Sequence, residues 1–147
     1  MIIYRVYKSI SDVLDTFEGF LQKLASHVDV DVMPGHSDFS SSFLPQQPLN
    51  SCLFPNLESV DSINLVTNPH KFELNGGLQF FGTSGQNIQD ILQYQKTDDI
   101  LEIMQQTLEM RHACPTAPDT LRAFPYVDQD PCVFEQAPHV YFAGNQE

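Results

Sequence analysis

The stretch Val-Asp-Val-Asp-Val-Met-Pro-Gly-His-Ser-Asp at residues 28–38 decides the fold. Valines alternate with aspartates over 28–32, which is the period-2 pattern of a strand with one buried face, and the Pro-Gly pair at 34–35 ends that strand sharply. The turn that follows carries His36 and Asp38. In α/β proteins, polar side chains at the carboxyl edge of a sheet often bind metals and phosphates. The stretch therefore predicts an α/β fold with a candidate site at this turn.

The composition is that of a folded, acidic protein. The chain has 147 residues, enough for one domain with a sizeable core, and 41% of them are hydrophobic. The 19 acidic residues outnumber the 7 Lys and Arg residues and give a net charge of -12. The basic residues are scattered, whereas nucleic-acid binding needs grouped ones that face phosphates. The sequence therefore argues against direct DNA binding.

The compartment is predicted from the cysteines and from the start of the chain. Cys52, Cys114 and Cys132 are far apart in sequence, so neither a disulfide framework nor a zinc cluster is indicated, and a reducing compartment fits. The first eight residues lack the features of a signal peptide. No apolar run approaches the roughly 18 residues of a membrane span. We expect an intracellular protein without a membrane segment.

Hydrophobic periodicity predicts three helices. Residues 10–25 carry apolar side chains at helical spacing, and Ser9 with Asp12 has the pattern of a capping box. A second helix is expected from about residue 88 to 94. A third is expected to begin at Thr97 as N-cap and to end near residue 111. Its predicted buried face carries Ile100, Leu101, Met104 and Leu108.

Further strands are expected after the first. Residues 63–67 form a short one, and 71–81 form a β-hairpin with one covered face, on which Phe72 and Leu74 alternate with charged residues. The nearly continuous apolar run at 139–143 predicts a strand buried on both faces. Because such a strand is unusual at the end of a domain, we expect the chain to be a fragment.

Two long loops are candidates for contact with other proteins. They span residues 39–55 and 112–137, contain several prolines, and carry apolar side chains that a flexible linker would lack. No residue in them can be assigned to a partner from the sequence.

Two glycine turns are candidates for a metal site. Gly35-His36-Ser37-Asp38 and Gly144-Asn145 each follow a predicted strand. Binuclear metallophosphoesterases use such turns to direct about seven ligands at two metals that activate a water. Here only His36, Asp38 and Asn145 are eligible, and no Asp-x-His, Gly-Asp or Gly-His-x-His pattern exists. We therefore expect no working metal site and no cofactor.

The segment Gly82-Thr83-Ser84-Gly85 could be taken for a phosphate-binding loop. A Walker A loop ends in Gly-Lys-Ser/Thr, and a dinucleotide fingerprint needs a third glycine and a downstream acid, neither of which is in place. A tight turn that caps the following helix is the better interpretation.

Six motifs lie in a fixed order along residues 31–145. They are Asp-Val-Met-Pro-Gly-x-x-Asp at 31–38, Leu-Pro-Gln-Gln-Pro-Leu at 44–49, Asn-Leu-Val-Thr-Asn-Pro at 64–69, Phe-Phe-Gly-Thr-Ser-Gly-Gln-Asn at 80–87, Cys-Pro-Thr-Ala-Pro-Asp-Thr-Leu at 114–121 and Pro-His-Val-Tyr-Phe-Ala-Gly-Asn at 138–145. Together they resemble the small B subunits of the DNA polymerase alpha, delta and epsilon family. The motif at 44–49 points to the delta branch of that family.

The resemblance implies a fold and a function. Members of this family join an OB-fold to a calcineurin-like phosphoesterase domain, a β-sandwich flanked by helices, whose catalytic residues have decayed. The chain would then be a partial inactivated phosphoesterase domain over residues 1–147, without the OB-fold and flanking strands. The implied function is that of a nuclear, non-catalytic scaffold in DNA strand elongation. It would tether the C-terminal metal-binding module of the catalytic subunit of DNA polymerase delta and a third accessory subunit, and reach DNA only through the complex.

The resemblance also assigns positions to the candidate residues. Gly35-His36-Ser37-Asp38 stands where active relatives carry Gly-Asn-His-Asp, so only Asp38 remains, and Gly144-Asn145 stands where they carry Gly-His. His36 receives no role. Further positions belong to loops of the family motifs, namely Gly82, Thr83, Ser84, Gly85, Pro115, Thr116, Pro118 and Asp119.

Two expectations remain open at this point. An active metal-dependent phosphoesterase or nuclease is the alternative function. In either case, the isolated segment is expected to be aggregation-prone or molten, because an unpaired central strand exposes backbone donors and acceptors.

Overall fold

The computed structural model describes residues 9–146 as a mixed α/β structure. The predicted features of the first eight residues lie outside the described part. Along the chain the elements are α1 (Ile10–Ala25), β1 (Val30–Val32), a 3₁₀ turn (Ser51–Leu53), β2 (Ile63–Leu65), β3 (His70–Leu74), β4 (Leu78–Thr83), α2 (Gln86–Leu92), α3 (Ile100–Glu109) and β5 (Val140–Ala143). No helix within residues 9–146 is long and apolar enough to cross a membrane.

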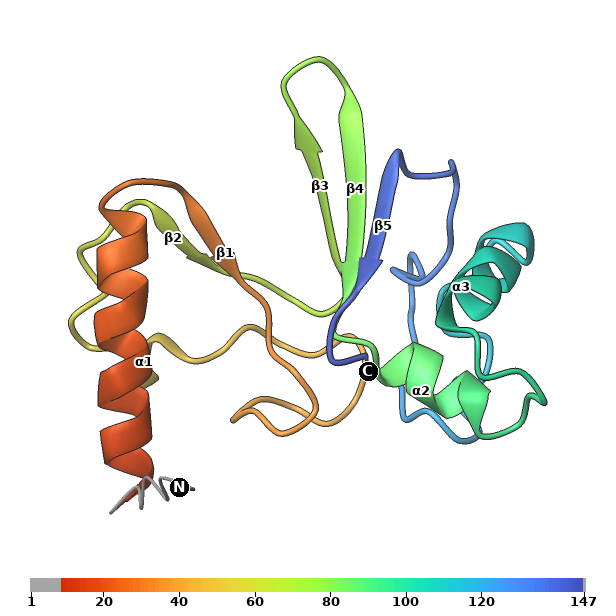
Figure 1. Cartoon of the computed structure of the whole chain (residues 1–147), viewed down its shortest axis with the longest axis horizontal. Coiled ribbons are helices and arrows are strands. Elements are labelled where there is room, and N and C mark those ends of the chain that lie inside the picture. The colour runs from red at the N-terminus through yellow and green to blue at the C-terminus, as the bar shows by residue number, and fades with distance from the viewer. Residues whose placement is uncertain (1–8, 147) are drawn as a thin grey trace, which may run out of the picture.

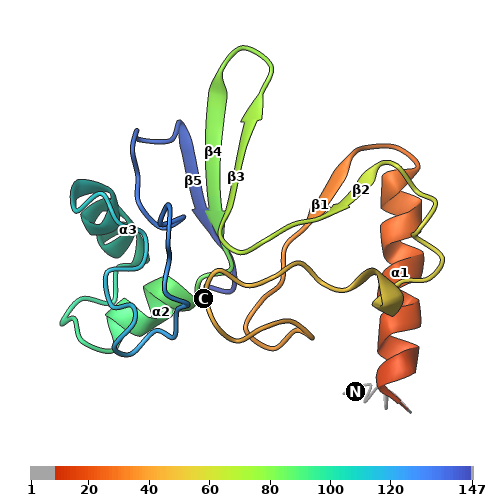
Figure 2. The same ribbon diagram turned by 180° about the vertical axis from the view of Figure 1, so that it is seen from behind.

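The strands form two small sheets. β1 and β2 pair in parallel, with Val30 opposite Ile63. The second sheet has the order β3-β4-β5, in which β3 and β4 form an antiparallel hairpin and β5 runs parallel to β4. Figures 1 and 2 show α1 beside the β1–β2 pair at one end of the molecule, and α2 and α3 on the β5 side of the other sheet.

α1 begins and ends where the sequence predicts. The Ser9 hydroxyl accepts the N–H of Asp12 at 3.2 Å, so the expected cap is confirmed. One apolar face packs on the β1–β2 pair and on the loop between these strands, with Leu21, Val32, Leu49, Phe54 and Leu57 buried together. On the same side of the helix, the buried carboxylate of Glu18 accepts the backbone N–H and the side-chain amide of Asn56, each at 2.7 Å. Both bonds compensate for the cost of burying this charge.

β1 is shorter than the predicted strand at 28–32. The N–H groups of His27 and Val28 both bond to the carbonyl of Leu24, at 3.0 and 3.2 Å, and so belong to the end of α1. Val28 is exposed, and only Val30 and Val32 face the core. The alternating valines correctly predicted a strand. Val28, however, belongs to the end of α1, so the strand begins at Val30.

The hairpin buries the face opposite to the one predicted. Phe81 is fully buried and packs edge-on against Phe134 and Tyr141, at ring-centroid distances of 4.7 and 5.5 Å. Phe72 is only half-buried and Leu74 is exposed. Alternation predicted a one-sided hairpin, but charged neighbours do not determine which side is covered, because the residues opposite in β4 decide it.

β5 is not buried on both faces, contrary to the prediction. Val140 and Phe142 are exposed, whereas Tyr141 points into the core beside Phe81. In the described part of the chain, β5 is an edge strand that pairs only with β4. The apolar run at 139–143 therefore forms a strand with two apolar faces. One face packs on the core through Tyr141, and the other is uncovered among the described residues.

α2 and α3 pack against each other through a small cluster of Ile88, Ile91 and Ile103. The N-cap of α3 is Asp99, not Thr97, because Asp99 Oδ1 accepts the N–H groups of Leu101 and Glu102. Of the predicted buried face, Ile100, Met104 and Leu108 do pack against the core, whereas Leu101 is 74% exposed. Ile103, which the prediction left out, is fully buried. α2 also begins two residues earlier than expected, at Gln86.

Candidate functional site

The turn after β1 is closed by its own carboxylate. Asp38 Oδ2 accepts the N–H of Gly35 at 2.7 Å. His36, Ser37 and Asp38 are exposed, whereas the carbonyl of Gly35 points inward and accepts from Gln46 Nε2 at 3.0 Å. The carboxylate thus stabilises the turn locally.

The turn after β5 is anchored to the loop at 82–85. The Gly144 N–H donates to the carbonyl of Thr83 at 2.9 Å. Asn145 has a φ of 54°, a left-handed conformation that Asn tolerates better than most residues, and its Nδ2 donates to the carbonyl of Ser84 at 3.0 Å. Its own carbonyl accepts from Gln89 Nε2 at 2.9 Å. Asn145 therefore ties the end of the sheet to α2.

The structure brings the two glycine turns together. A Cβ atom added to Gly35 would lie 3.3 Å from Asp38 Oδ2 and 3.5 Å from Asn145 Nδ2. The contact between the turns lies near the middle of the molecule, where the chain leaves β1 and where β5 ends (Figure 1). At this contact, the Asp38 carboxylate, which already accepts the N–H of Gly35, and the neutral amide of Asn145 both lie beside Gly35.

A buried network of amides lies behind these turns. Asn68 Nδ2 lies 2.6 Å from Gln46 Oε1 and 2.7 Å from Ser84 Oγ, and Asn68 Oδ1 accepts the N–H of Ser84 at 3.1 Å. Gln86 adds a bond from its Nε2 to Gln46 Oε1 at 3.0 Å. Gln46, Asn68 and Ser84 are all buried. The network connects the loop at 39–55, the segment after β2 and the start of α2 through uncharged groups.

The donor set at the turns does not fit a dinuclear metal centre. Such a centre needs several carboxylate, imidazole or amide ligands directed at one point. Among residues 9–146, no group of three or more His, Cys, Asp or Glu side chains lies close enough together to hold a metal ion. The nearby carboxylate of Asp31 pairs with His70 Nε2 at 3.2 Å and accepts from Asn64 at 2.9 Å.

The segment Gly82-Thr83-Ser84-Gly85 is a turn with a structural role. A Cβ on Gly82 would overlap the ring of Phe142, and a Cβ on Gly85, whose φ is +95°, would overlap the carbonyl of Gly144. The Thr83 hydroxyl donates to Asn87 Oδ1 at 3.0 Å, and the Ser84 side chain belongs to the amide network. The polar atoms of this turn are therefore used within the protein.

The motif at 115–119 lies apart from the glycine turns. It forms a turn in which the Thr120 N–H bonds to the carbonyl of Thr116 at 3.2 Å, and the Thr120 hydroxyl donates to Asp90 of α2 at 2.6 Å. Pro115, Pro118 and Asp119 are exposed. No hydrogen bond between described residues connects this turn with those at 35–38 and 144–145.

A family model that describes the B subunit of DNA polymerase alpha/epsilon matches residues 5–147. The chain belongs to this family. The DNA polymerase delta small subunit of Arabidopsis thaliana is 46% identical over 86% of the chain, that of rice (Oryza sativa subsp. japonica) 44% over 94%, and that of Saccharomyces cerevisiae 38% over 90%. The family resemblance of the six motifs is thereby confirmed. The matches cover 29%, 32% and 33% of these relatives, so the chain spans about a third of their length.

The buried amide network is built from residues of the family motifs, a connection that the sequence analysis did not predict. Gln46, Asn68 and Ser84 each lie within a motif that carried the resemblance, at 44–49, 64–69 and 80–87. Three motifs that are separate in sequence thus converge on one buried cluster. The signal in the sequence was the presence of uncharged polar residues inside these three motifs.

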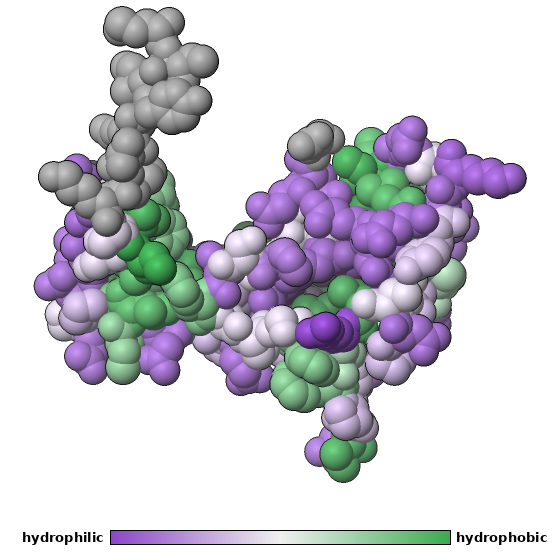
Figure 3. Space-filling view, turned by 90° about the horizontal axis from the view of Figure 1, so that it is seen from below, coloured by the Kyte–Doolittle hydropathy of each residue, from purple (hydrophilic) through white to green (hydrophobic). Residues whose placement is uncertain are grey.

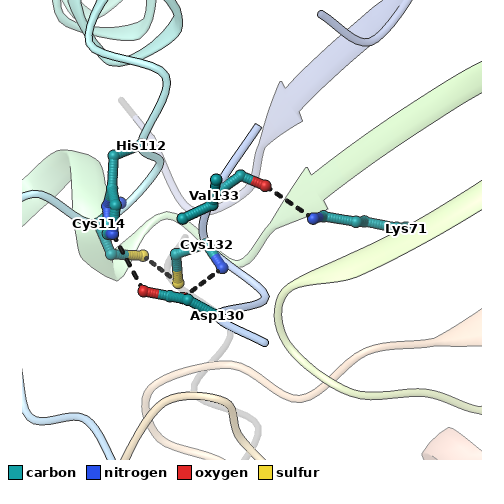
Figure 4. A network of polar contacts seen from close by, with 6 residues as sticks. All are labelled: Lys71, His112, Cys114, Asp130, Cys132 and Val133. Atoms are coloured by element: carbon teal, nitrogen blue, oxygen red, sulfur yellow. Dashed lines mark hydrogen bonds and ion pairs between the residues drawn. The ribbon is translucent and has the colours of Figure 1, made fainter. Parts of the chain in front are cut away.

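Sequence reasoning also missed a cluster of titratable groups beside α3, shown in Figure 4. Cys114 and Cys132 are buried with their Sγ atoms 3.1 Å apart. The hydrogen bond with Cys132, followed by burial, raises the pKa of Cys114. Nearby, His112 Nε2 pairs with Asp130 Oδ2 at 3.1 Å. The pair was not apparent from the sequence because 18 positions separate the two cysteines.

The two long loops predicted as contact surfaces meet each other. The Leu44 N–H donates to the carbonyl of Arg122 at 2.9 Å, and the Phe124 N–H donates to the carbonyl of Leu44 at 2.8 Å. The rings of Phe43 and Phe124 lie 5.1 Å apart, both exposed, and the Arg122 guanidinium lies 5.9 Å from the Phe43 ring. We call these three side chains the loop patch. Figure 3 shows several separate apolar areas on the face seen from below.

Proposed function

We propose that the chain is part of a non-catalytic accessory subunit of DNA polymerase delta that acts as a scaffold in DNA strand elongation in the nucleus. Support comes from the names of relatives that are 38–46% identical over most of the chain. The scattered basic residues fit a subunit that reaches DNA through its complex. In this proposal, residues 1–147 form part of an inactivated phosphoesterase domain.

The observation that carries the proposal is the buried amide network behind the two glycine turns. Uncharged Gln, Asn and Ser side chains hold together the segments that a dinuclear enzyme would hold through metal ligands. Asp38, the one carboxylate of the turns, bonds to the N–H of Gly35. Such a set of groups fits a role in maintaining a shape better than a role in holding metal ions that activate water.

The exposed face of the β3-β4-β5 sheet supports the proposed sandwich. Pairing in this sheet places Phe72 opposite Phe80 and Phe80 opposite Val140, and the rings of Phe72 and Phe80 stack at 4.7 Å. Phe142 lies on the same face, over Gly82. The inner face of a β-sandwich has this apolar character, since it packs on a second sheet about 10 Å away. We assign that second layer to the remaining length of the subunit.

The loop patch is the proposed docking surface for the catalytic subunit. Aromatic and arginine side chains dominate the binding energy of protein interfaces. Phe43, Phe124 and Arg122 are exposed, yet the backbone bonds between the loops hold them in place, so little conformational entropy is lost on binding. The partner is the C-terminal metal-binding module of the catalytic subunit, and a third accessory subunit binds elsewhere.

Metal analysis and hydrolysis separate the scaffold from the alternative phosphoesterase. The purified chain and its Asp38→Asn variant are equilibrated with Mn²⁺, dialysed, and measured for metal content and for hydrolysis of a generic phosphodiester. We expect no stoichiometric metal and equal background rates for both proteins. One or two bound metals, with turnover lost in Asp38→Asn, would establish an enzyme instead.

A binding experiment tests the docking surface. The C-terminal metal-binding module of the catalytic subunit is titrated with the chain, with the double variant Phe43→Ala/Phe124→Ala, and with Leu101→Ala as a matched exposed control. We expect the double variant to lose about tenfold or more in affinity and the control to bind like the parent. Equal affinity of all three proteins would show that the loop patch is not the docking surface.

A further inference from the structure

Cys114 and Cys132 face each other across two adjacent segments of the chain. The N–H of Ala113 donates to the carbonyl of Cys132 at 2.7 Å, and the N–H of Phe134 donates to the carbonyl of Arg111 at 3.0 Å, so the backbones are held side by side. The two Sγ atoms are 3.1 Å apart, and a disulfide of about 2.05 Å requires them to approach by about 1 Å more.

Both thiols are buried, and only Cys132 borders a surface pocket. Cys132 lines an open pocket of about 340 Å³ together with His112, Pro118, Tyr126 and Asp130, and Cys114 does not belong to its lining. The pocket is large enough for a molecule the size of hydrogen peroxide. A small oxidant therefore meets Cys132 first.

From this geometry we propose that the pair is an oxidative modification site, at which hydrogen peroxide converts Cys114 and Cys132 into a reversible intramolecular disulfide. The Cys132 sulfur attacks one peroxide oxygen, the O–O bond breaks, and water leaves as a sulfenic acid forms. The Cys114 sulfur then attacks the Cys132 sulfur, the S–O bond breaks, and a second water leaves. The two thiols lose two electrons and two protons, and the peroxide is reduced to two waters.

The surroundings assign different roles to the two cysteines. Because hydrogen bonding to Cys132 and burial raise the pKa of Cys114, that residue keeps its proton at neutral pH and acts as the resolving thiol. Cys52 is exposed and has no cysteine partner among the described residues. It can react faster with peroxide, but its product is a sulfenic or higher acid or a link between two chains.

Oxidation has a structural consequence at a second place. Asp130, Pro131 and Val133 form one wall of an open groove of about 1040 Å³, and Lys71 Nζ donates to the carbonyl of Val133 across it at 3.0 Å. Figure 4 shows Cys132 close to Asp130 and Val133, with Cys114 beside it. A disulfide would fix the wall to the segment that follows α3. We expect the oxidised chain to unfold at a temperature several degrees higher than the reduced chain, because the cross-link restricts the unfolded state.

The test compares folded and unfolded chain under the same oxidant. The full chain with Cys52→Ser is treated with graded hydrogen peroxide in buffer and in denaturing urea, quenched, and analysed by intact mass and by peptide mapping without reductant. We expect a loss of about 2 Da and a linked peptide pair containing Cys114 and Cys132, formed at least about tenfold faster in the folded chain. A phosphine reductant should reverse the change.

Single variants test the order of events. With Cys114→Ser, peroxide should leave Cys132 as a sulfenic acid that dimedone traps, whereas Cys132→Ser should give little adduct at Cys114. Equal rates of linkage in folded and unfolded chain, or unchanged thiols in the folded chain, would overturn the proposal without relying on any variant of the pair. Equal dimedone labelling of both single variants would overturn the assigned order.

Discussion

At the scale of single residues, the buried amides are the most unusual feature of this chain. Gln46 is 1% exposed and takes part in bonds to Gly35, Ser41, Asn68 and Gln86. Buried polar groups stabilise a protein only when their partners are present, since an unpaired donor or acceptor keeps its desolvation cost. The network is therefore sensitive to the loss of any one member.

Gln46→Ala should lower the free energy of unfolding by about 2–3 kcal/mol, because it leaves several buried groups without partners. Urea denaturation followed by circular dichroism measures the change. The adjacent Gln47→Ala is the matched control, since Gln47 is exposed, and should be within about 0.5 kcal/mol of the parent. Similar losses for both variants would contradict a specific role of the network.

Buried phenols make the stability fall in alkaline solution. Burial raises the pKa of Tyr141 above its ordinary value of 10.0. The unfolded chain therefore loses this proton at a lower pH than the folded chain, so the stabilisation is complete below about pH 10 and decreases as the pH rises further. Unfolding free energies measured between pH 8 and about 11 test this. Tyr141→Phe should make the unfolding free energy fall less steeply with pH. If the slope is unchanged in this variant, other groups cause the decrease.

At the scale of elements, a capping side chain holds the first turn of α1 and of α3. α3 shows how local competition sets such an end. Asp99 caps the helix, whereas Thr97 accepts the N–H of Asp99 and donates to Glu102 Oε2 at 2.7 Å, supporting the cap from outside. Both residues are good caps by type, and only the backbone conformation distinguishes them.

Asp99→Ala should cost about 1 kcal/mol of stability, because the N–H groups of Leu101 and Glu102 lose their acceptor. Thr97→Ala should cost less than about half of that, since it removes only a supporting bond. Thermal unfolding of the two variants beside the parent gives the comparison. A larger loss for Thr97→Ala would mean that the helix begins earlier in solution.

At the scale of the whole molecule, two apolar faces are uncovered among the described residues. One is the aromatic face of the β3-β4-β5 sheet. The other lies along α1, where five residues at spacings of three and four are exposed: Ile10, Val13, Phe17, Phe20 and Leu24. Large contiguous apolar patches on a soluble chain indicate interfaces or a tendency to associate.

The isolated chain should therefore associate and bind hydrophobic dyes such as ANS. The double variant Phe72→Thr/Phe80→Thr should reduce both effects, while Leu101→Thr, an isolated exposed leucine, should leave them unchanged. Sedimentation velocity and ANS fluorescence provide the two measurements. A monomer without ANS binding, together with sharp, dispersed amide NMR signals, would contradict this expectation.

The sequence alone determined the features that depend on neighbouring residues. The Ser9 cap, the full length of α1, the hairpin around residues 75–77 and the turn at Gly85 follow from local hydrogen bonding and backbone freedom, and the family followed from six ordered motifs. The tertiary structure alone decided which face of the hairpin is buried, that Gln46, Asn68 and Ser84 meet, and that Cys114 lies against Cys132. Those contacts join segments 16 to 22 positions apart. Periodicity carries no information about such pairings, because they are selected by the packing of the whole chain.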